Sequence, residues 1–329
     1  MKSQGRLKKR SNSLKPYLTK DNKKTRLEFA LSFVKPNQVF DRMYDVVHVD
    51  EKWLYLTKLI GKYYVYDDEQ LPTRHVESKR FITKVMFLAA VARPRFDFHS
   101  HKYFDGKLGV WTFVSREPAL RSSVKRPKGA LITRPLSVTA DAYLDMLTSK
   151  VIPAIIEKMP PSARTRTVFI QQDNAGPHSS KVNKAICEMD CSDGWNIQMP
   201  NQPPNNPDFN VLDLGFFNAI QSLQYQSTPS NIDELIDAVV YSFGALPSDT
   251  LGKTFVTLQK VLQISIDIEG SDAYKLPHMN KNGTIEDLST FNLSCEEDSL
   301  VLALSKLNRR LEDESNLEDL MNCLDEVAI

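Results

Sequence analysis

The chain has 329 residues, with 41% hydrophobic residues, 25% charged residues and a formal net charge of +1. These are values of a globular protein, and they exclude a disordered or fibrous chain. The longest wholly apolar run, residues 85–92, is too short to cross a bilayer, so we expect no membrane span. Four cysteines are too few for a disulfide scaffold and predict reduced thiols in an intracellular protein.

The charge is distributed unevenly, and the two ends of the chain differ in sign. Residues 1–26 contain ten Lys or Arg against one acid, whereas residues 296–329 contain ten acids against three bases. A basic arm suits phosphate backbones or an import receptor, and a solvated tail is the alternative. Lys8, Lys9 and Arg10 are therefore candidates for DNA contacts and also a short nuclear-import signal, which predicts nuclear localisation.

The first half of the chain is predicted to be rich in strands. Residues 1–40 form a basic linker with a short helix over 19–33. Aromatic and β-branched residues then predict strands at 46–57, 62–67, 80–92 and 107–114. Apolar residues at helical spacing predict a helix over 142–159.

From residue 167 the pattern alternates. It predicts a strand at 167–173, a helix at 179–189, a strand at 195–199 and a helix at 211–224. A meander of strands followed by strands that alternate with helices is the element order of an RNase H-like α/β fold. Such a fold is a mixed sheet flanked by helices. We expect this domain to span residues 41–227.

Residues 228–329 are predicted to form a helical extension that ends in the acidic tail. Helices are expected at 231–246 and 248–267, followed by a loop at 268–294 and a closing amphipathic helix. Leu300, Leu304, Leu307 and Leu311 share one face of that last helix. Such a stripe is typical of core packing, and a homodimer interface is the alternative.

Three acids occupy the places where a sheet protein presents catalytic groups. Asp50 and Asp173 end predicted strands, and Asp213 opens the helix after the next strand. Carboxylates in such positions converge on the crevice beyond the carboxyl edge of a sheet. Each acid taken alone has a structural explanation, because Asp also caps turns and offsets helix dipoles.

The chemistry that suits such a trio is phosphodiester hydrolysis. Two metal ions about 3.5–4 Å apart activate the attacking oxygen and neutralise the leaving oxygen. Mg²⁺ prefers carboxylate oxygens and keeps several waters, so three carboxylates are enough.

Three segments around these acids resemble the catalytic domain of mariner-like transposases of the DDE/D type. They are HVDEKW at 48–53, IQQDNAGPH at 170–178 and QPPNNPDFNVLDLGFF at 202–217. There are 122 residues between Asp50 and Asp173, and 39 between Asp173 and Asp213, which resembles the branch with three Asp and a 39-residue spacing. Further runs also resemble this branch and extend the likeness from about residue 13 to residue 283.

The resemblance implies an RNase H-like DDE superfamily endonuclease with two Mg²⁺ or Mn²⁺ ions and no organic cofactor. It implies cleavage at both transposon ends and transfer of the freed 3′-OH into target DNA at a TA dinucleotide. Asp50 would bridge both ions, Asp173 would hold one and Asp213 the other. Asp208 is the substitute for the third acid.

Further residues are candidates around this site. Asn174 and His178 are candidates for contacts to phosphate or to the metal ligands, and Trp53 is expected in the core. A set of basic residues is predicted to contact phosphate groups of DNA, and the alternative is that they form an ordinary solvated surface. They are Arg74, Lys79, Arg80, Lys84, Arg93 and Arg95.

The sequence departs from the family at its start, where a helix-turn-helix region that binds the transposon ends is expected and is missing. Gly176 and Asn206 are smaller departures. Four alternatives stay open: a truncated inactive copy, a transposase-derived DNA-binding or assembly protein that does not cut, another RNase H-like nuclease acting on RNA–DNA hybrids, and a metal-independent glycosidase using two acids.

Overall fold

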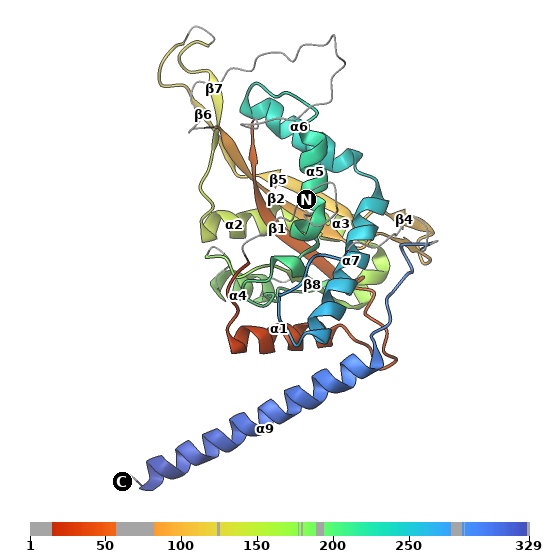
Figure 1. Cartoon of the computed structure of the whole chain (residues 1–329). Helices are drawn as coiled ribbons and strands as arrows, with labels where there is room; N and C mark the ends of the chain where they lie inside the picture. Colours follow the sequence, from red (N-terminus) through yellow and green to blue (C-terminus); the bar gives the residue numbers. More distant parts are fainter. Residues whose placement is uncertain are drawn as a thin grey trace, which may run out of the picture.

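A five-stranded mixed sheet forms the centre of the molecule, with helices packed against both faces (Figure 1). The computed structural model describes residues 15–56, 82–123, 126–176, 178, 180–188, 194–277, 285 and 287–327. The strand order is β5-β2-β1-β8-β9. These strands are β1 (Val46–Tyr55), β2 (Lys84–Ala92), β5 (Lys107–Thr112), β8 (Thr167–Gln171) and β9 (Asn196–Gln198).

The sheet has an antiparallel half and a parallel half. β1 pairs antiparallel with β2, and β2 pairs antiparallel with β5. On the other side of β1, β8 and β9 are parallel to it. β2 reads KVMFLAAVA, a run that is apolar on both faces and suits a strand covered on both sides. The RNase H-like strand order expected from the sequence is confirmed.

Alternation along β1 divides the core into two layers. Val46 and Leu54 point into one layer, together with residues from α1, α5, α6 and α7. Val47 and Val49 point into the other, together with residues from α2, α3 and α4. The helices of these two layers are α1 (Lys20–Ser32), α2 (Ala140–Met146), α3 (Ile152–Lys158), α4 (Ser180–Glu188), α5 (Phe217–Gln224), α6 (Ile232–Ala245) and α7 (Ser248–Asp267).

Local sequence explains where several helices start. The Thr19 side chain accepts from the Asn22 amide at the start of α1, and Asn231 accepts from Glu234 at the start of α6. A π-helical turn, Leu147–Val151, joins α2 to α3, so the predicted helix over 142–159 is one continuous element with a wider turn in its middle. Another π-helical turn, Leu212–Phe216, leads into α5.

Two short hairpins were not predicted. β3 (Arg95–Asp97) pairs with β4 (Lys102–Phe104), and β6 (Val114–Pro118) pairs with β7 (Leu131–Pro135). The strand predicted at 107–114 therefore ends earlier, and Phe113 separates β5 from β6. The strand predicted at 62–67 lies outside the described residues.

The last helix, α9 (Glu297–Val327), runs away from the body of the molecule (Figure 1). Leu300 and Ala303 pack against the core, whereas Leu304 and Leu311 are exposed. Of the leucine stripe, therefore, only Leu300 packs against the core, and the homodimer interface stays a prediction. In the part of the chain that the structure describes, no helix is both long and apolar enough to cross a membrane.

The three predicted segments share one core. Leu27 and Ala30 from the linker helix lie in the same buried cluster as Leu235 and Phe255 from the C-terminal helices. Near the end of the chain, the Cys295 amide also donates to the Gln38 carbonyl. The linker and the extension therefore pack directly on the sheet domain.

Candidate active site

Asp50 lies in β1, and Asp173 follows the end of β8, the parallel neighbour of β1. His48 of β1 pairs with Gln171 of β8, and Asp50 and Asp173 each follow two residues later. Side chains two apart on a strand share a face, and neighbouring strands are about 4.8 Å apart. The register therefore brings Asp50 and Asp173 to one edge of the sheet.

The third acid is carried to this edge by a polar turn. Asn210 accepts a hydrogen bond from the Leu212 amide at 3.0 Å, which starts the π-helical turn containing Asp213. The side-chain amide of Asn210 donates to the Val49 carbonyl at 3.0 Å. Asp213 therefore starts its helix beside the strand residue that precedes Asp50.

Electrostatics shows that these carboxylates sense one another. Burial, followed by the negative charges of Asp213, Glu51 and Asp173, raises the pKa of Asp50 well above its ordinary value. Asp50 is 9% exposed. A buried carboxylate surrounded by like charges is a place where a cation binds favourably.

Two basic side chains already neutralise part of this cluster. Lys52, on the same face of β1 as Asp50, places its Nζ 2.8 Å from Oδ1 of Asp213. His178 lies between two acids, with Nδ1 2.6 Å from Asp173 Oδ1 and Nε2 3.0 Å from Glu51 Oε1. Although burial opposes its charging, these two hydrogen bonds raise the pKa of His178 to about 10. Burial raises the pKa of Asp173, but the hydrogen bond from His178 outweighs burial and holds this pKa below its ordinary value.

The two predicted neighbours of Asp173 have different surroundings. His178 is buried between the acids, as described above. The Asn174 side chain donates to the Gln202 carbonyl at 2.6 Å and so joins the Asp173 loop to the segment that leads to the third acid. The structure thus brings His178 into the acid cluster and places Asn174 beside it.

Among the residues of this site that the sequence did not reveal is Tyr143. The Tyr143 ring, on α2, lies 4.2 Å from the His178 ring, and its hydroxyl donates to Gln172 Oε1 at 3.0 Å. It is completely buried. No local motif marks Tyr143, because its partners follow about thirty residues later in the chain.

The substitute acid has another role. Asp208 accepts hydrogen bonds from Arg26 of α1 and from Tyr274, and Arg26 also donates to Asn206. The Arg26 side chain is fully buried, and its guanidinium lies 4.0 Å from the Phe209 ring centroid. Asp208 is therefore engaged in anchoring the linker helix to the turn before Asp213.

The predicted phosphate contacts have mixed outcomes. Lys84 is exposed at the start of β2, and its Nζ lies 4.2 Å from the centroid of the half-buried Trp53 ring. Arg93 and Arg95 contradict the prediction, because both are buried and donate to backbone carbonyls such as those of Leu288 and Tyr44. The remaining candidates lie outside the described residues: Lys8, Lys9, Arg10, Arg74, Lys79 and Arg80.

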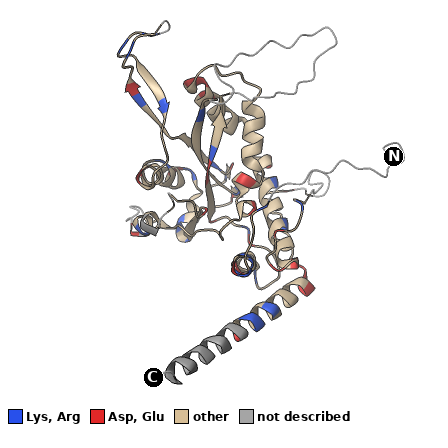
Figure 2. Ribbon diagram, turned by 60° about the vertical axis from the view of Figure 1, so that its left-hand side comes forward, with Lys and Arg blue, Asp and Glu red and all other residues tan. Residues whose placement is uncertain are grey.

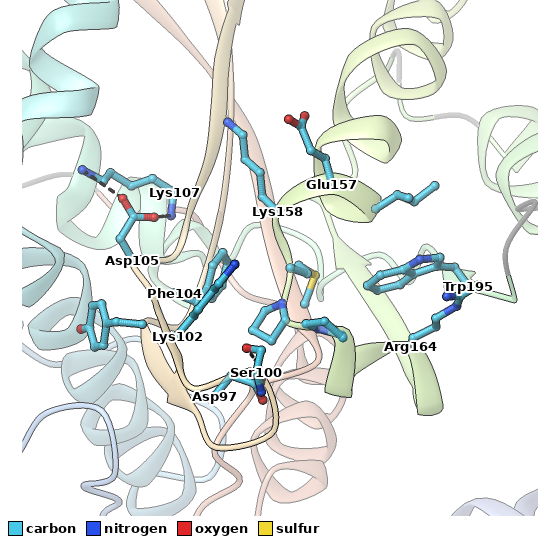
Figure 3. Close-up of a pocket in the computed structure, with 15 residues that line it drawn as sticks. Asp97, Ser100, Lys102, Phe104, Asp105, Lys107, Glu157, Lys158, Arg164 and Trp195 are labelled. Atoms are coloured by element: carbon cyan, nitrogen blue, oxygen red, sulfur yellow. Dashed lines mark hydrogen bonds and ion pairs between the residues drawn. The ribbon is translucent and has the colours of Figure 1, made fainter.

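A cavity of about 700 Å³ opens at the opposite end of the sheet (Figure 3). Arg164 and Trp195, which precede β8 and β9, line it together with Lys102 and Phe104 of the β3–β4 hairpin. Lys158 also lines it and donates to the Leu108 carbonyl. None of the acids discussed above borders this cavity, so it is separate from the acid cluster.

The donor set suits a hard divalent cation in its chemistry, because such ions prefer carboxylate oxygens. In this arrangement, however, no three Asp, Glu, His or Cys side chains of the described ranges lie close enough together to hold one ion. Lys52 and His178 hold two of the acids instead. A metal bound by Asp213 would therefore share this carboxylate with Lys52 or compete with it.

The sequence matches no protein-family model and no curated protein. Solved structures do match. The Mos1 mariner paired-end complex with Mn superposes with a TM-score of 0.58 at 16% identity, covering 83% of this chain and 70% of that chain. The Mos1 strand transfer complex superposes with a TM-score of 0.55 at 16% identity, covering 83% of this chain and 69% of that chain. The catalytic domain of Mos1 mariner transposase gives 0.50 at 15% identity, with 79% and 98% covered. The chain therefore has the RNase H-like fold of the mariner transposase catalytic domain.

Proposed function

We propose that the chain is the catalytic part of a DNA transposase that cuts phosphodiester bonds at transposon ends. The observation that supports the proposal is that Asp50 in β1 and Asp173 after β8 follow paired residues of neighbouring strands, while Asn210 joins the start of the Asp213 helix to Val49. The Mos1 neighbours, which include paired-end and strand transfer complexes, support DNA as the substrate. Transfer of the freed 3′-OH into a TA target is part of the same proposal.

We infer that Asp50, Asp173 and Asp213 hold divalent ions, Mg²⁺ or Mn²⁺, as in the Mos1 complexes named with these metals. Such ions would activate the attacking oxygen and neutralise charge on the leaving oxygen. Asp50 would be one of the ligands, because the negative charges of both Asp213 and Asp173 act on its carboxylate. His178 orients Asp173, and Asn210 fixes the start of the Asp213 helix.

The test is cleavage of DNA with each acid replaced. We expect purified protein to nick plasmid and duplex DNA with Mg²⁺ or Mn²⁺ and not with EDTA. Asp50→Asn, Asp173→Asn and Asp213→Asn should each abolish nicking, whereas Asp141→Asn, an exposed acid of α2, should retain it. Full activity in Asp213→Asn would remove the third acid from the site.

The second candidate is a transposase-derived protein that binds DNA without cutting it. The ion pairs on Asp213 and Asp173 favour it, because they neutralise the cluster without a metal. DNA binding that persists in EDTA, with no nicking under any metal condition, would support this candidate. Nuclear localisation and a homodimer are proposed for either function and rest on the sequence alone.

A further inference from the structure

The β6–β7 hairpin is an exposed basic ribbon that none of the functional roles above uses. Residues 114–135 contain six Lys or Arg against a single acid, Glu117. Of the basic residues, Arg116, Arg121, Lys128 and Arg134 are exposed. Figure 2 shows Lys and Arg along this ribbon, away from the body of the molecule.

The single acid does not neutralise the ribbon. Its Oε2 lies 3.8 Å from Arg134 Nε, and both side chains are 51% exposed, so this is a weak surface pair. The net positive charge of the ribbon thus stays available to solvent. Leu120 and Leu131 are exposed beside it, with 78% and 71% of their surface accessible.

The ribbon rises from the same edge of the sheet as the acids. Lys52 of β1 pairs with Phe87 of β2, and Phe87 pairs with Thr112 of β5. β5 therefore ends at the level of Lys52, two residues beyond Asp50, and β6 starts directly after Phe113. The ribbon thus continues outward from the acid cluster rather than from the cavity at the opposite end.

The base of the ribbon is fixed to the domain. The Leu136 amide donates to the Phe113 carbonyl at 2.9 Å, and the Thr133 hydroxyl donates to Asp233 of α6 at 2.6 Å. The two strands pair without interruption from Val114 with Pro135 to Pro118 with Leu131. A ligand held by the ribbon would therefore keep a defined position relative to the acids.

We propose that the β6–β7 ribbon binds the phosphate backbone of duplex DNA beside the acid cluster. Clustered Arg and Lys bind duplex DNA through its phosphates, and a two-stranded ribbon is narrow enough to follow a groove. The inference rests on the proposed function for its substrate, since it names the surface that holds the DNA to be cut. Single-stranded nucleic acid and a protein partner held by the exposed leucines are the competing occupants.

The experiment measures binding separately from cleavage. Anisotropy of a labelled duplex of arbitrary sequence is followed in EDTA, between about 50 and 200 mM salt, with the full chain. Arg121→Gln combined with Lys128→Gln should weaken binding on the order of 10-fold or more and reduce the salt slope by about two, since each phosphate contact contributes about 0.9. The control, Lys102→Gln with Lys275→Gln, removes the same charge from exposed residues elsewhere and should bind as the wild type does.

Each outcome decides the proposal. The proposal is overturned if the control variant loses as much affinity for DNA as the ribbon variant does. It is also overturned if the ribbon variant keeps the affinity and salt slope of the wild type, or if it loses affinity only for single-stranded DNA or RNA. A wild-type protein that binds through the ribbon but never nicks DNA supports the ribbon and contradicts the proposed nuclease. A wild-type protein that nicks DNA, together with a ribbon variant that binds DNA normally, supports the proposed nuclease and contradicts the role of the ribbon. Unchanged urea midpoints confirm that both variants are folded, as expected for exposed positions.

Discussion

The side-chain amide of Asn210 donates to the backbone carbonyl of Val49, the residue before Asp50, at 3.0 Å. Its oxygen accepts from the Leu212 amide, the residue before Asp213, also at 3.0 Å. One buried side chain thus joins the neighbours of the first and third acids. No charge is involved, so this link does not depend on whether a metal is bound.

We expect Asn210→Ala to lower the free energy of unfolding by about 1–3 kcal/mol, because it leaves a buried carbonyl and a buried amide without partners. Urea denaturation followed by tryptophan fluorescence measures this loss. Asn196→Ala is the control, because Asn196 makes an exposed hydrogen bond to Thr167. This substitution should change the free energy of unfolding by no more than about 0.5 kcal/mol. Similar losses in the two variants would contradict the role given to Asn210.

Lys52→Met should bind Mn²⁺ more tightly than the wild type. The ammonium of Lys52 and a metal ion compete for the Asp213 carboxylate, so removing the ammonium removes the competitor. Titration of free Mn²⁺ by electron paramagnetic resonance measures the affinity without requiring activity. Lys35→Met removes a Lys–Asp pair, Lys35 with Asp41, outside the site and should leave Mn²⁺ binding unchanged. Weaker binding in Lys52→Met would show that Lys52 supports the metal rather than competing with it.

The pH dependence of stability should report the charge on His178. The pKa of His178 is raised to about 10 in the folded protein, against 6.5 ordinarily, so the folded state keeps a proton that the unfolded chain releases between these values. The stabilisation is complete below pH 6.5 and is lost as the pH rises to about 10. Thermal unfolding of metal-free protein should show this loss in the wild type and in His99→Gln, an exposed control, and not in His178→Gln. A parallel decline in all three proteins would assign it to other groups.

Arg26→Met should destabilise the fold by about 3 kcal/mol, because it leaves Asp208 and Asn206 without their buried partner. Chemical denaturation measures the loss. Arg310→Met, which breaks a surface pair with Asp21, should cost less than about 1 kcal/mol. The combination of Arg26→Met with Asp208→Asn should cost less than the sum of the single changes, because the two residues interact directly. Strict additivity would argue against that interaction.

The sequence predicts those features that depend on short segments. The apolar runs of β1 and β2, the starts of the helices predicted at 19–33 and 231–246, and the position of Asp50 in its strand all follow from local patterns. Each of these patterns reflects burial or hydrogen bonding within a few residues. Elements of this kind were therefore predicted close to their observed ends.

The features that were missed depend on contacts between distant segments. Lys52 and Asp213 are 161 positions apart, and nothing near either residue indicates that they pair. Arg93 was expected on the surface because it is charged, yet its partners come from the segment around Asn292. The β6–β7 hairpin was missed because both faces of it are partly exposed, so its strands lack the apolar alternation that reveals half-buried strands.

The central place of β1 in the sheet has one more consequence. Because successive side chains of a strand point to opposite faces, a slip of β1 by a single residue would turn Asp50 away from Asp213 and present Glu51 in its place. Such a slip would break hydrogen-bond ladders with β2 and β8 at the same time. The first acid is thus held in place by both neighbours of its strand, whereas the third is held by the Asn210 hydrogen bonds and by its ion pair with Lys52.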